Sequence, residues 1–102
     1  MSTVTDDDFA EWADWFKCLA DPSRLKILNF VSSQTEPLTV GDIVEFTGQS
    51  QSTVSHHLKI LGTQRFVLTE ADGVRTLVRR NELCMTELPL VAAAIMARSL
   101  EA

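Results

Sequence analysis

The spacing of apolar residues changes near Gly62, and this change constrains the fold more than any other feature of the chain. Before Gly62, apolar side chains recur every three or four residues, which is typical of amphipathic helices. After it, two strand-like runs, 66–70 and 74–79, flank Asp72-Gly73, a dipeptide that favours a tight hairpin turn. Helical spacing then returns. The sequence therefore predicts a mainly α fold with one small β-hairpin, in the order α-α-α-α-β-β-α.

Capping residues set the first helix boundaries. Residues 1–6 are polar, and we expect them to be flexible. A first helix is expected at 7–20, with acidic residues at its N-terminus, where the helix dipole favours negative charge. Asp21 and Pro22 then predict a second helix, as its N-cap and its first helical residue.

A short helix, a tight turn and a second helix are predicted over residues 39–61, which is the form of a helix-turn-helix. Thr39 caps the first of these helices, and Gly48 suits the left-handed position that ends it. Ser50 caps the second helix, which we expect to be ended by Gly62.

The last third of the chain combines the hairpin with a final helix. The hairpin occupies residues 65–80, directly after the helix-turn-helix, and therefore resembles a wing. Asn81 is the expected cap of a helix over 82–100, although Pro89 leaves open a later start at Thr86. We expect the whole chain, 1–102, to form a single winged-helix domain.

Size and composition narrow the class of protein. A chain of 102 residues suits one domain, and its modest core could gain apolar contacts by dimerisation. No apolar run approaches the roughly 20 residues of a membrane span, and residues 1–6 lack the features of a secretory signal. Cys18 and Cys84 are too few for a disulfide framework. A cytoplasmic location is expected.

The net charge of −5 argues against a nucleic-acid partner, but the charge is unevenly distributed. Residues 1–21 carry six acidic residues and one basic residue, a net −5. Residues 49–80 carry five basic residues and two acidic ones, a net +3. The segment with the helix-turn-helix and the hairpin is therefore the basic part of the chain.

The second helix of the helix-turn-helix has two different faces. At about 100° per residue, Val54, Leu58 and Leu61 share one face and are expected in the core. The polar residues elsewhere on this helix are candidates for DNA contacts: Gln51, Ser52, Thr53, Ser55, His56 and Lys59. A recognition helix needs such a face to reach base edges, while its N-terminus meets phosphate. An ordinary solvated helix face is the alternative.

Basic residues of the hairpin complete the predicted DNA surface. Arg75 and Arg79, with Arg80 beside them, could contact the DNA backbone next to the recognition helix. Phosphate contacts position a protein on DNA, whereas base contacts specify the site.

Two separated segments resemble the ArsR/SmtB family of repressors. Residues 16–28, FKCLADPSRLKIL, resemble the family's entry motif, and residues 51–61, QSTVSHHLKIL, resemble its recognition helix. The resemblance covers roughly residues 9–100. It implies a winged-helix homodimer that represses an operator and releases it when an effector binds. It also implies that the helices at 7–20 and 82–100 form the dimer interface, for which we expect Trp12, Trp15, Phe16, Leu88, Val91 and Ile95, with packing inside one chain as the alternative.

The metal sites of the resembled family are incomplete in this sequence. Thr39 and Gly41 stand where one family site has a Cys-x-Cys pair. At the second family site, Ile95 and Arg98 occupy the positions of later ligands and cannot bind zinc.

The two cysteines and Glu82 are the remaining candidates for sensing an effector. If the outer helices pack together, Cys18 and Cys84 could bind a soft metal or metalloid ion, or be oxidised to a disulfide. A buried cysteine that acts only as a small apolar residue is the alternative. His56 and His57 cannot chelate one ion, because adjacent helix residues point about 100° apart.

The predicted function is that of a homodimeric, DNA-binding transcriptional repressor of the ArsR type. Its expected partners are a double-stranded operator and a second copy of the chain, with no membrane. No cofactor is assigned, and the candidate effectors are a metal or metalloid ion and a thiol-reactive oxidant. The alternatives are a protein–protein interaction module and an ArsR-like regulator without a metal effector. An enzyme is not expected, because no Ser/His/Asp or Cys/His arrangement is placed for catalysis.

Overall fold

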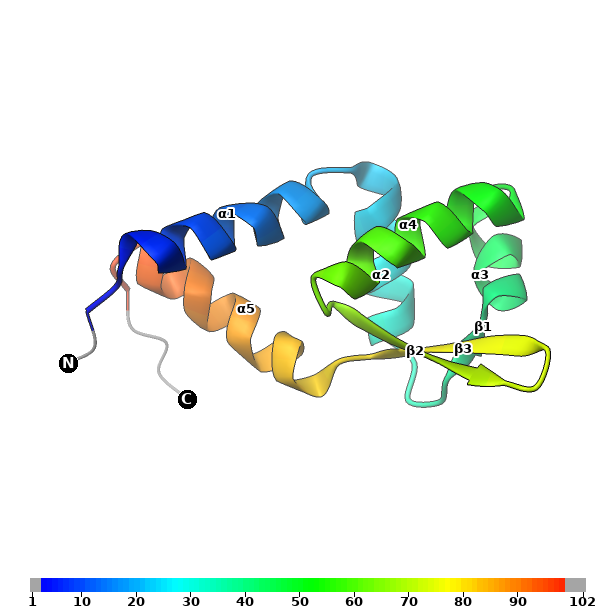
Figure 1. The fold of residues 1–102 in the computed structure, drawn as a ribbon. Helices are drawn as coiled ribbons and strands as arrows, with labels where there is room; N and C mark the ends of the chain where they lie inside the picture. Colours follow the sequence, from blue (N-terminus) through cyan, green and yellow to red (C-terminus); the bar gives the residue numbers. More distant parts are fainter. Residues whose placement is uncertain (1–2, 99–102) are drawn as a thin grey trace.

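Helices and a small sheet follow one another in the predicted order in the computed structural model, which describes residues 3–98 (Figure 1). The helices are α1 (Asp6–Leu19), α2 (Pro22–Ser32), α3 (Val40–Thr47), α4 (Gln51–Thr63) and α5 (Glu82–Ile95). The strands are β1 (Leu38–Thr39), β2 (Val67–Asp72) and β3 (Arg75–Arg80). The winged helix-turn-helix fold is confirmed, and β1 is an additional strand that the sequence pattern did not predict.

Side-chain caps fix the starts of the helices. The predicted caps Asp21, Thr39, Ser50 and Asn81 each accept a hydrogen bond from a backbone N–H of the first turn. Helix α1 starts at Asp6, one residue before the expected 7–20 range, because Thr5 and Asp8 form a reciprocal capping box. Residues 1 and 2 of the expected flexible start lie outside the described residues.

Helix α4 ends later than predicted. Gly62 was expected to end it, but Gly62 lies inside the helix, which continues to Thr63. The left-handed position belongs instead to Arg65, with a φ of 63°. The N–H of Arg65 donates to the Gly62 carbonyl, and the N–H of Phe66 donates to the Leu61 carbonyl, both at 3.0 Å. These two bonds form a Schellman motif, which ends the helix without a glycine.

Helix α5 starts where Asn81 predicts and continues through Pro89, so the later start at Thr86 is wrong. The expected 82–100 range is too long, because the helix ends at Ile95. Ala97 takes a left-handed φ of 53°, and the Arg98 N–H donates to the Ala93 carbonyl at 2.8 Å. Residues 99 and 100 of the expected range lie outside the described part of the chain.

The strands form an antiparallel sheet in the order β1-β3-β2. Val78 in the middle strand pairs with Leu38 on one side and Thr69 on the other. One face of this sheet packs on the core through Val67 and Val78, which are almost fully buried. The hairpin is therefore attached to the helices at its base, while its tip projects into solvent (Figure 1).

The apolar core lies between α2, α3, α4 and the base of the sheet. Its fully buried side chains are Ile27, Val31, Ile43, Val54, Leu61, Val67 and Val78. The molecule is elongated, 47 × 25 × 22 Å, because α1 and α5 extend together from one end of this core (Figure 1). Among the described residues, no helix has the length and apolar character needed to cross a membrane.

Candidate nucleic-acid interface

Helix α4 presents the two faces that the sequence predicts. Val54, Leu58 and Leu61 are buried against the core. The six polar residues predicted to contact DNA are all exposed to solvent: Gln51, Ser52, Thr53, Ser55, His56 and Lys59. These side chains are therefore free to contact a partner without any rearrangement of the core.

The N-terminal end of α4 is ordered by a cluster of hydroxyl groups. The Ser50 hydroxyl accepts from the Thr53 N–H at 3.2 Å and donates to the Thr53 hydroxyl at 2.9 Å. The Ser52 hydroxyl lies 3.3 Å from the Ser50 hydroxyl. The remaining N–H groups of the first turn and the helix dipole favour a negatively charged group at this end.

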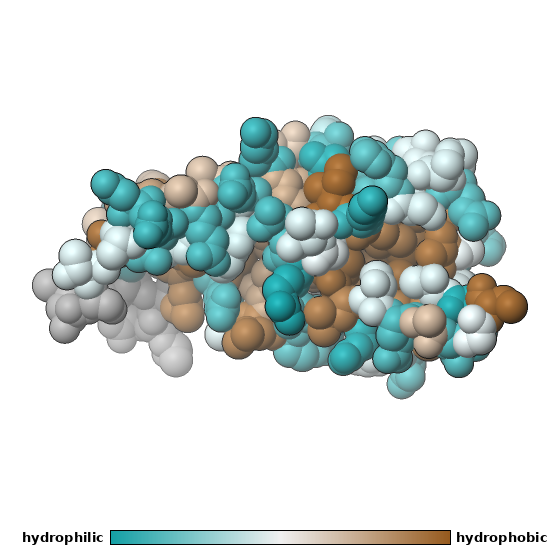
Figure 2. All heavy atoms as spheres, in the orientation of Figure 1, coloured by the Kyte–Doolittle hydropathy of each residue, from teal (hydrophilic) through white to brown (hydrophobic). Residues whose placement is uncertain are grey.

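An open groove of about 720 Å³ lies between α4 and the wing. Its polar and charged lining comes from both elements: Ser55, Lys59 and Thr63 from α4, Arg65 from the link, and Thr69 and Thr76 from the wing. Figure 2 shows apolar side chains between α4 and the wing on this side of the molecule, with hydrophilic side chains around them. The groove is open to solvent along its length between the two elements.

The wing arginines project from the face opposite the core. Successive side chains of a strand alternate between faces, so Arg75 and Arg79 lie on the face opposite Val78. Arg79 is paired in register with Leu68. Arg75 donates to the Asp72 carboxylate at 2.9 Å near the hairpin tip. The structure thus places both predicted wing residues outside the groove, and it partly neutralises Arg75.

Arg80 has a structural role at the base of the wing. Its Nε donates to Glu82 at 2.7 Å, and its Nη1 donates to the Ser32 carbonyl at 2.9 Å. These bonds join the wing to α2 and to the start of α5, and they engage Glu82, one of the predicted sensing residues.

Two basic side chains of the groove are without an ion-pair partner among residues 3–98. They are Lys59, which was predicted, and Arg65, which was not. Arg65 belongs to the basic segment 49–80, but its position after the expected helix end gave no signal that it would line a groove. Its left-handed backbone directs the chain from α4 into β2.

The two cysteines are free thiols in a protected environment. Cys18 is buried, and its Sγ donates to the Ile60 carbonyl at 3.8 Å. Burial raises the pKa of the Cys18 thiol, and the nearby Arg24 charge offsets only part of this effect. Burial also raises the pKa of the Cys84 thiol, and Glu87 and Cys18 add to that increase. Neither environment favours a reactive thiolate.

Side chains that could bind a metal ion are not clustered within the described range. No group of three or more His, Cys, Asp or Glu residues in 3–98 is arranged to hold an ion. Cys84 instead lines an apolar pocket of about 210 Å³, with Leu28, Phe66 and Leu88 among its neighbours.

The residues predicted for the dimer interface divide into two groups. Phe16 and Ile95 are 38% and 45% exposed, as an unpaired interface requires. Val91 is buried within the chain, Leu88 packs against the core, and Trp15 packs edge-on against Phe66 at 6.2 Å. Trp12 is half-buried. Further apolar side chains of α1 and α5 are exposed, namely Phe9, Leu83, Met85 and Leu90.

Comparisons with known proteins agree with this geometry. The family model described as "Bacterial regulatory protein, arsR family" matches residues 21–69. The transcriptional repressor SmtB homolog of Synechocystis sp. is 41% identical over 60% of this chain, a match that spans only 45% of that protein. The arsenical resistance operon repressor of Staphylococcus xylosus is 36% identical over 72% of this chain and 68% of its own length.

One solved structure extends the similarity to nearly the whole chain. It is the homodimeric winged helix-turn-helix DNA-binding domain of a possible ArsR-family transcriptional regulator from Mycobacterium bovis. It matches with a TM-score of 0.70 and 25% sequence identity, over 99% of this chain and 94% of that one.

Proposed function

The chain belongs to the ArsR family of bacterial regulatory proteins, and from this premise we propose that it is a homodimeric transcriptional repressor. It binds a double-stranded DNA operator as a single winged-helix domain, and it acts in the cytoplasm, where that operator lies. In this proposal the protein acts by binding to its operator and does not catalyse a reaction. The relatives support this reading, since two are named as repressors and the solved neighbour is named as a homodimeric DNA-binding domain.

The observation that carries the proposal is the exposed polar face of α4 beside an open groove. The major groove of DNA admits one α-helix and presents donors and acceptors that distinguish all base pairs. Gln51, Ser52 and Thr53, at the N-terminal end of α4, would lie nearest the base edges. The Ser55, His56 and Lys59 side chains continue this surface along the helix.

Basic side chains around α4 would supply the phosphate contacts. Lys59 and Arg65 line the groove, while Arg75 and Arg79 extend from the outer face of the wing. The segment 49–80 carries +3 in one chain, and two chains bring +6 to a DNA site. Such contacts position a protein on DNA and make binding weaker at high salt.

The proposal is tested by selecting duplexes from a random-sequence library with the wild-type protein. We expect a sequence-specific site whose affinity falls with salt concentration. Ser52→Ala combined with His56→Ala should then weaken binding at least tenfold, since each good base contact contributes about 1–3 kcal/mol. As a matched control, Asn29→Ala with Thr35→Ala changes two exposed polar residues outside α4 and should leave affinity unchanged. Failure to select any site, or equal affinity of both double variants, contradicts the proposal.

For the effector, we propose a soft metal or metalloid ion or a thiol-reactive oxidant that acts at Cys18 and Cys84, with Glu82 as the candidate carboxylate once it leaves its ion pair with Arg80. One relative is named for arsenical resistance, and both thiols border the same apolar core. Because both thiol pKa values are raised, release from DNA should be slow at neutral pH and faster at higher pH.

Arsenite, zinc and hydrogen peroxide are suitable probes for this release. Replacing both cysteines with alanine should abolish the response to each of them. If the double variant is still released from DNA, sensing lies elsewhere. If wild-type protein is released by none of these compounds, the proposed effector site at the two thiols is contradicted.

A further inference from the structure

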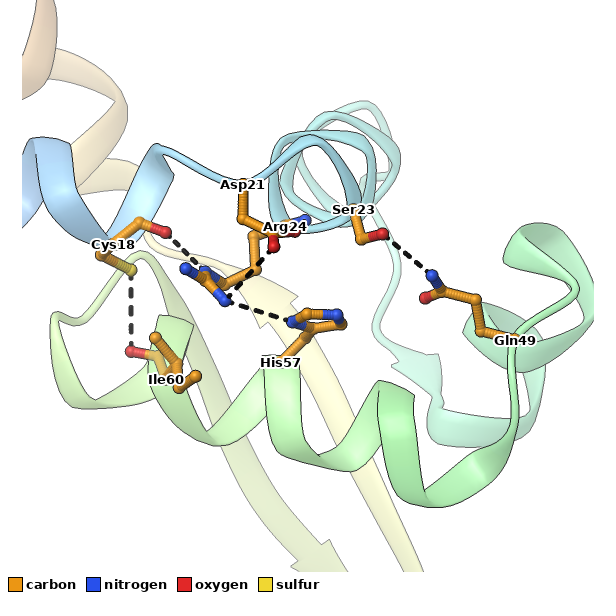
Figure 3. Close-up of polar contacts among 7 residues, drawn as sticks. All are labelled: Cys18, Asp21, Ser23, Arg24, Gln49, His57 and Ile60. Carbon is orange, nitrogen blue, oxygen red and sulfur yellow. Dashed lines mark hydrogen bonds and ion pairs between the residues drawn. The ribbon is translucent and has the colours of Figure 1, made fainter.

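Arg24, in the first turn of α2, connects the end of α1 with the middle of α4 (Figure 3). Its Nε donates to the Cys18 carbonyl at 2.6 Å. Its Nη1 lies 3.4 Å from Nδ1 of His57 and 3.9 Å from the Asp21 carboxylate. The Arg24 side chain is only 15% exposed, so these contacts are largely shielded from water.

The neighbouring residue, Ser23, makes a second connection to α4. The Gln49 side-chain amide donates to the Ser23 hydroxyl at 2.9 Å (Figure 3). Gln49 directly precedes Ser50, the N-cap of α4. Two adjacent residues of α2 therefore hold α4 at its start and at its middle, which constrains the direction of the helix.

His57 and His56 occupy different sides of α4. His57 is half-buried and faces Arg24, whereas His56 is exposed on the outer face that carries the proposed base contacts. The ring centroids of the two histidines are 6.0 Å apart. His57 is therefore the histidine whose ring is in direct contact with a charged residue of α2.

The Arg24–His57 contact depends on the protonation state of His57. A guanidinium is always charged and only donates, so Nδ1 of His57 must be the acceptor and the ring proton must be on Nε2. A protonated imidazole would direct an N–H toward the guanidinium and bring two positive charges within 3.4 Å of each other.

The charged groups around this contact have opposing effects on a positive charge at His57. On α2, Arg24 opposes a charge on His57, whereas the Asp21 carboxylate favours it. On α1, Lys17 and Asp14 line a depression beside Arg24 and carry opposite charges, and the Cys18 thiol is neutral. The turn between α3 and α4 contributes the uncharged Gln49. Of these groups, Arg24 is the one in direct contact with the His57 ring, at 3.4 Å.

We propose that Arg24 and His57 are positioning residues that hold α4 in its DNA-reading orientation, and that only the neutral form of His57 does so. This inference rests on the proposed DNA-binding function. It predicts that the two histidines respond oppositely to acid. A charged His56 on the outer face attracts phosphate and strengthens binding, whereas a charged His57 breaks the contact with Arg24 and weakens it.

The chain has only two histidines, so their effects can be separated completely. Binding to a duplex selected by the wild-type protein is measured from about pH 8 to about pH 5.5, the range in which histidine titrates. In a His56→Asn background, acidification should weaken binding about tenfold, equivalent to about 1.4 kcal/mol. Adding His57→Asn should flatten the profile while preserving affinity at about pH 8, because the asparagine oxygen replaces Nδ1 as acceptor. Identical pH profiles for the single and double variants would overturn the inference.

Two further variants separate positioning from simple packing. His57→Ala removes the acceptor and should weaken binding at every pH, although the free energy of unfolding is measured to confirm that the protein folds. Arg24→Gln removes the positive charge beside His57, and in the His56→Asn background it should flatten the profile as His57→Asn does. If His57→Ala binds as tightly as the wild type, or Arg24→Gln leaves the profile unchanged, His57 does not position α4 through Arg24.

A measurement made without DNA tests this inference independently of the proposed DNA-binding function. The ¹⁵N NMR spectrum of the His57 ring reports which nitrogen carries the proton. We expect the Nε2–H tautomer alone at about pH 8, and an increased fraction of the Nδ1–H tautomer in Arg24→Gln. An Nδ1–H tautomer in the wild type overturns the inference, whether or not the protein binds DNA. The expected tautomer together with failure to select any duplex would instead contradict the proposed function alone.

Discussion

Two glycines of the helix-turn-helix should respond in opposite ways to the same substitution. Gly62 is inside α4, and a methyl group added there meets no atom within 4 Å. Gly62→Ala should therefore raise the free energy of unfolding by about 0.5–1 kcal/mol, since alanine has less conformational freedom to lose. Gly48 also has free space, but its φ is 71°. Gly48→Ala should lower stability by about 1 kcal/mol, because the left-handed region disfavours a Cβ. Urea unfolding of both variants measures these changes. If both substitutions raise, or both lower, the free energy of unfolding, the prediction is wrong.

The buried thiols should make the fold less stable in alkali. Burial raises the pKa of both Cys18 and Cys84, so the folded protein retains thiol protons that the unfolded chain loses above about pH 8.5. The unfolded state then binds fewer protons than the native state, and the free energy of unfolding falls as pH rises. Urea unfolding under reducing conditions, from about pH 7.5 to about pH 9.5, measures this fall.

Cys18→Ala combined with Cys84→Ala provides the control for that measurement. The chain has no tyrosine, so few other groups titrate in the same range. The double variant should lose much less stability than the wild type between the two pH limits. An equal loss in both proteins would show that the thiols do not cause the alkaline sensitivity.

Features of the helices and strands that depend on neighbouring residues could be predicted from the sequence, whereas features that depend on distant residues could not. Local signals predicted the starts of α2, α3, α4 and α5, since each cap acts within three residues of its own position. Strand β1 was missed because two residues cannot show an alternating pattern, and its partner β3 lies far along the chain. The end of α4 was misplaced because Arg65, not Gly62, takes the left-handed conformation. The Arg24–His57 contact joins residues 33 apart, and no local pattern indicates it.

The recognition helix α4 and the wing should contribute unequally to the salt dependence of DNA binding. Lys59 has no ion-pair partner among the described residues and lines the groove, so its replacement by alanine should reduce the salt slope by about 1 for each chain. Arg75 is already paired with Asp72 at 2.9 Å, so Arg75→Ala should reduce the slope by less. Anisotropy titrations over a series of salt concentrations measure both slopes. A larger effect at Arg75 would indicate that the wing tip dominates the phosphate contacts.

The whole molecule separates its charges along its long axis. Helices α1 and α5 lie together at one end, and α4, α3 and the wing lie at the other (Figure 1). The first turn of α1 carries Asp6, Asp7 and Asp8, whereas segment 49–80 carries the +3 charge. The total charge of −5 therefore does not describe the surface that would face DNA. Acidic residues at the far end would instead weaken non-specific attraction to phosphate.

The same separation makes dimerisation testable without touching the DNA surface. Leu90 and Ile95 on α5 are 52% and 45% exposed, and a chain of this size gains stability by covering such side chains. We expect the wild type to sediment as a dimer at micromolar concentration and Leu90→Glu to sediment as a monomer. Val74→Glu is the matched control, because Val74 is fully exposed at the wing tip and should leave the dimer intact.

Loss of the dimer should also weaken operator binding, although α4 itself is unchanged in Leu90→Glu. Two linked recognition helices bind two half-sites, and the second contact is then effectively intramolecular. Separating them should lower affinity for a selected symmetric duplex by at least 100-fold, within the roughly 10²–10⁴-fold gain typical of bivalent binding. A shorter duplex with one half-site should be bound equally by the wild type and Leu90→Glu, which would show that the recognition surface is intact. If Leu90→Glu is monomeric yet binds the full site as tightly as the wild type, α5 does not serve to join two recognition helices.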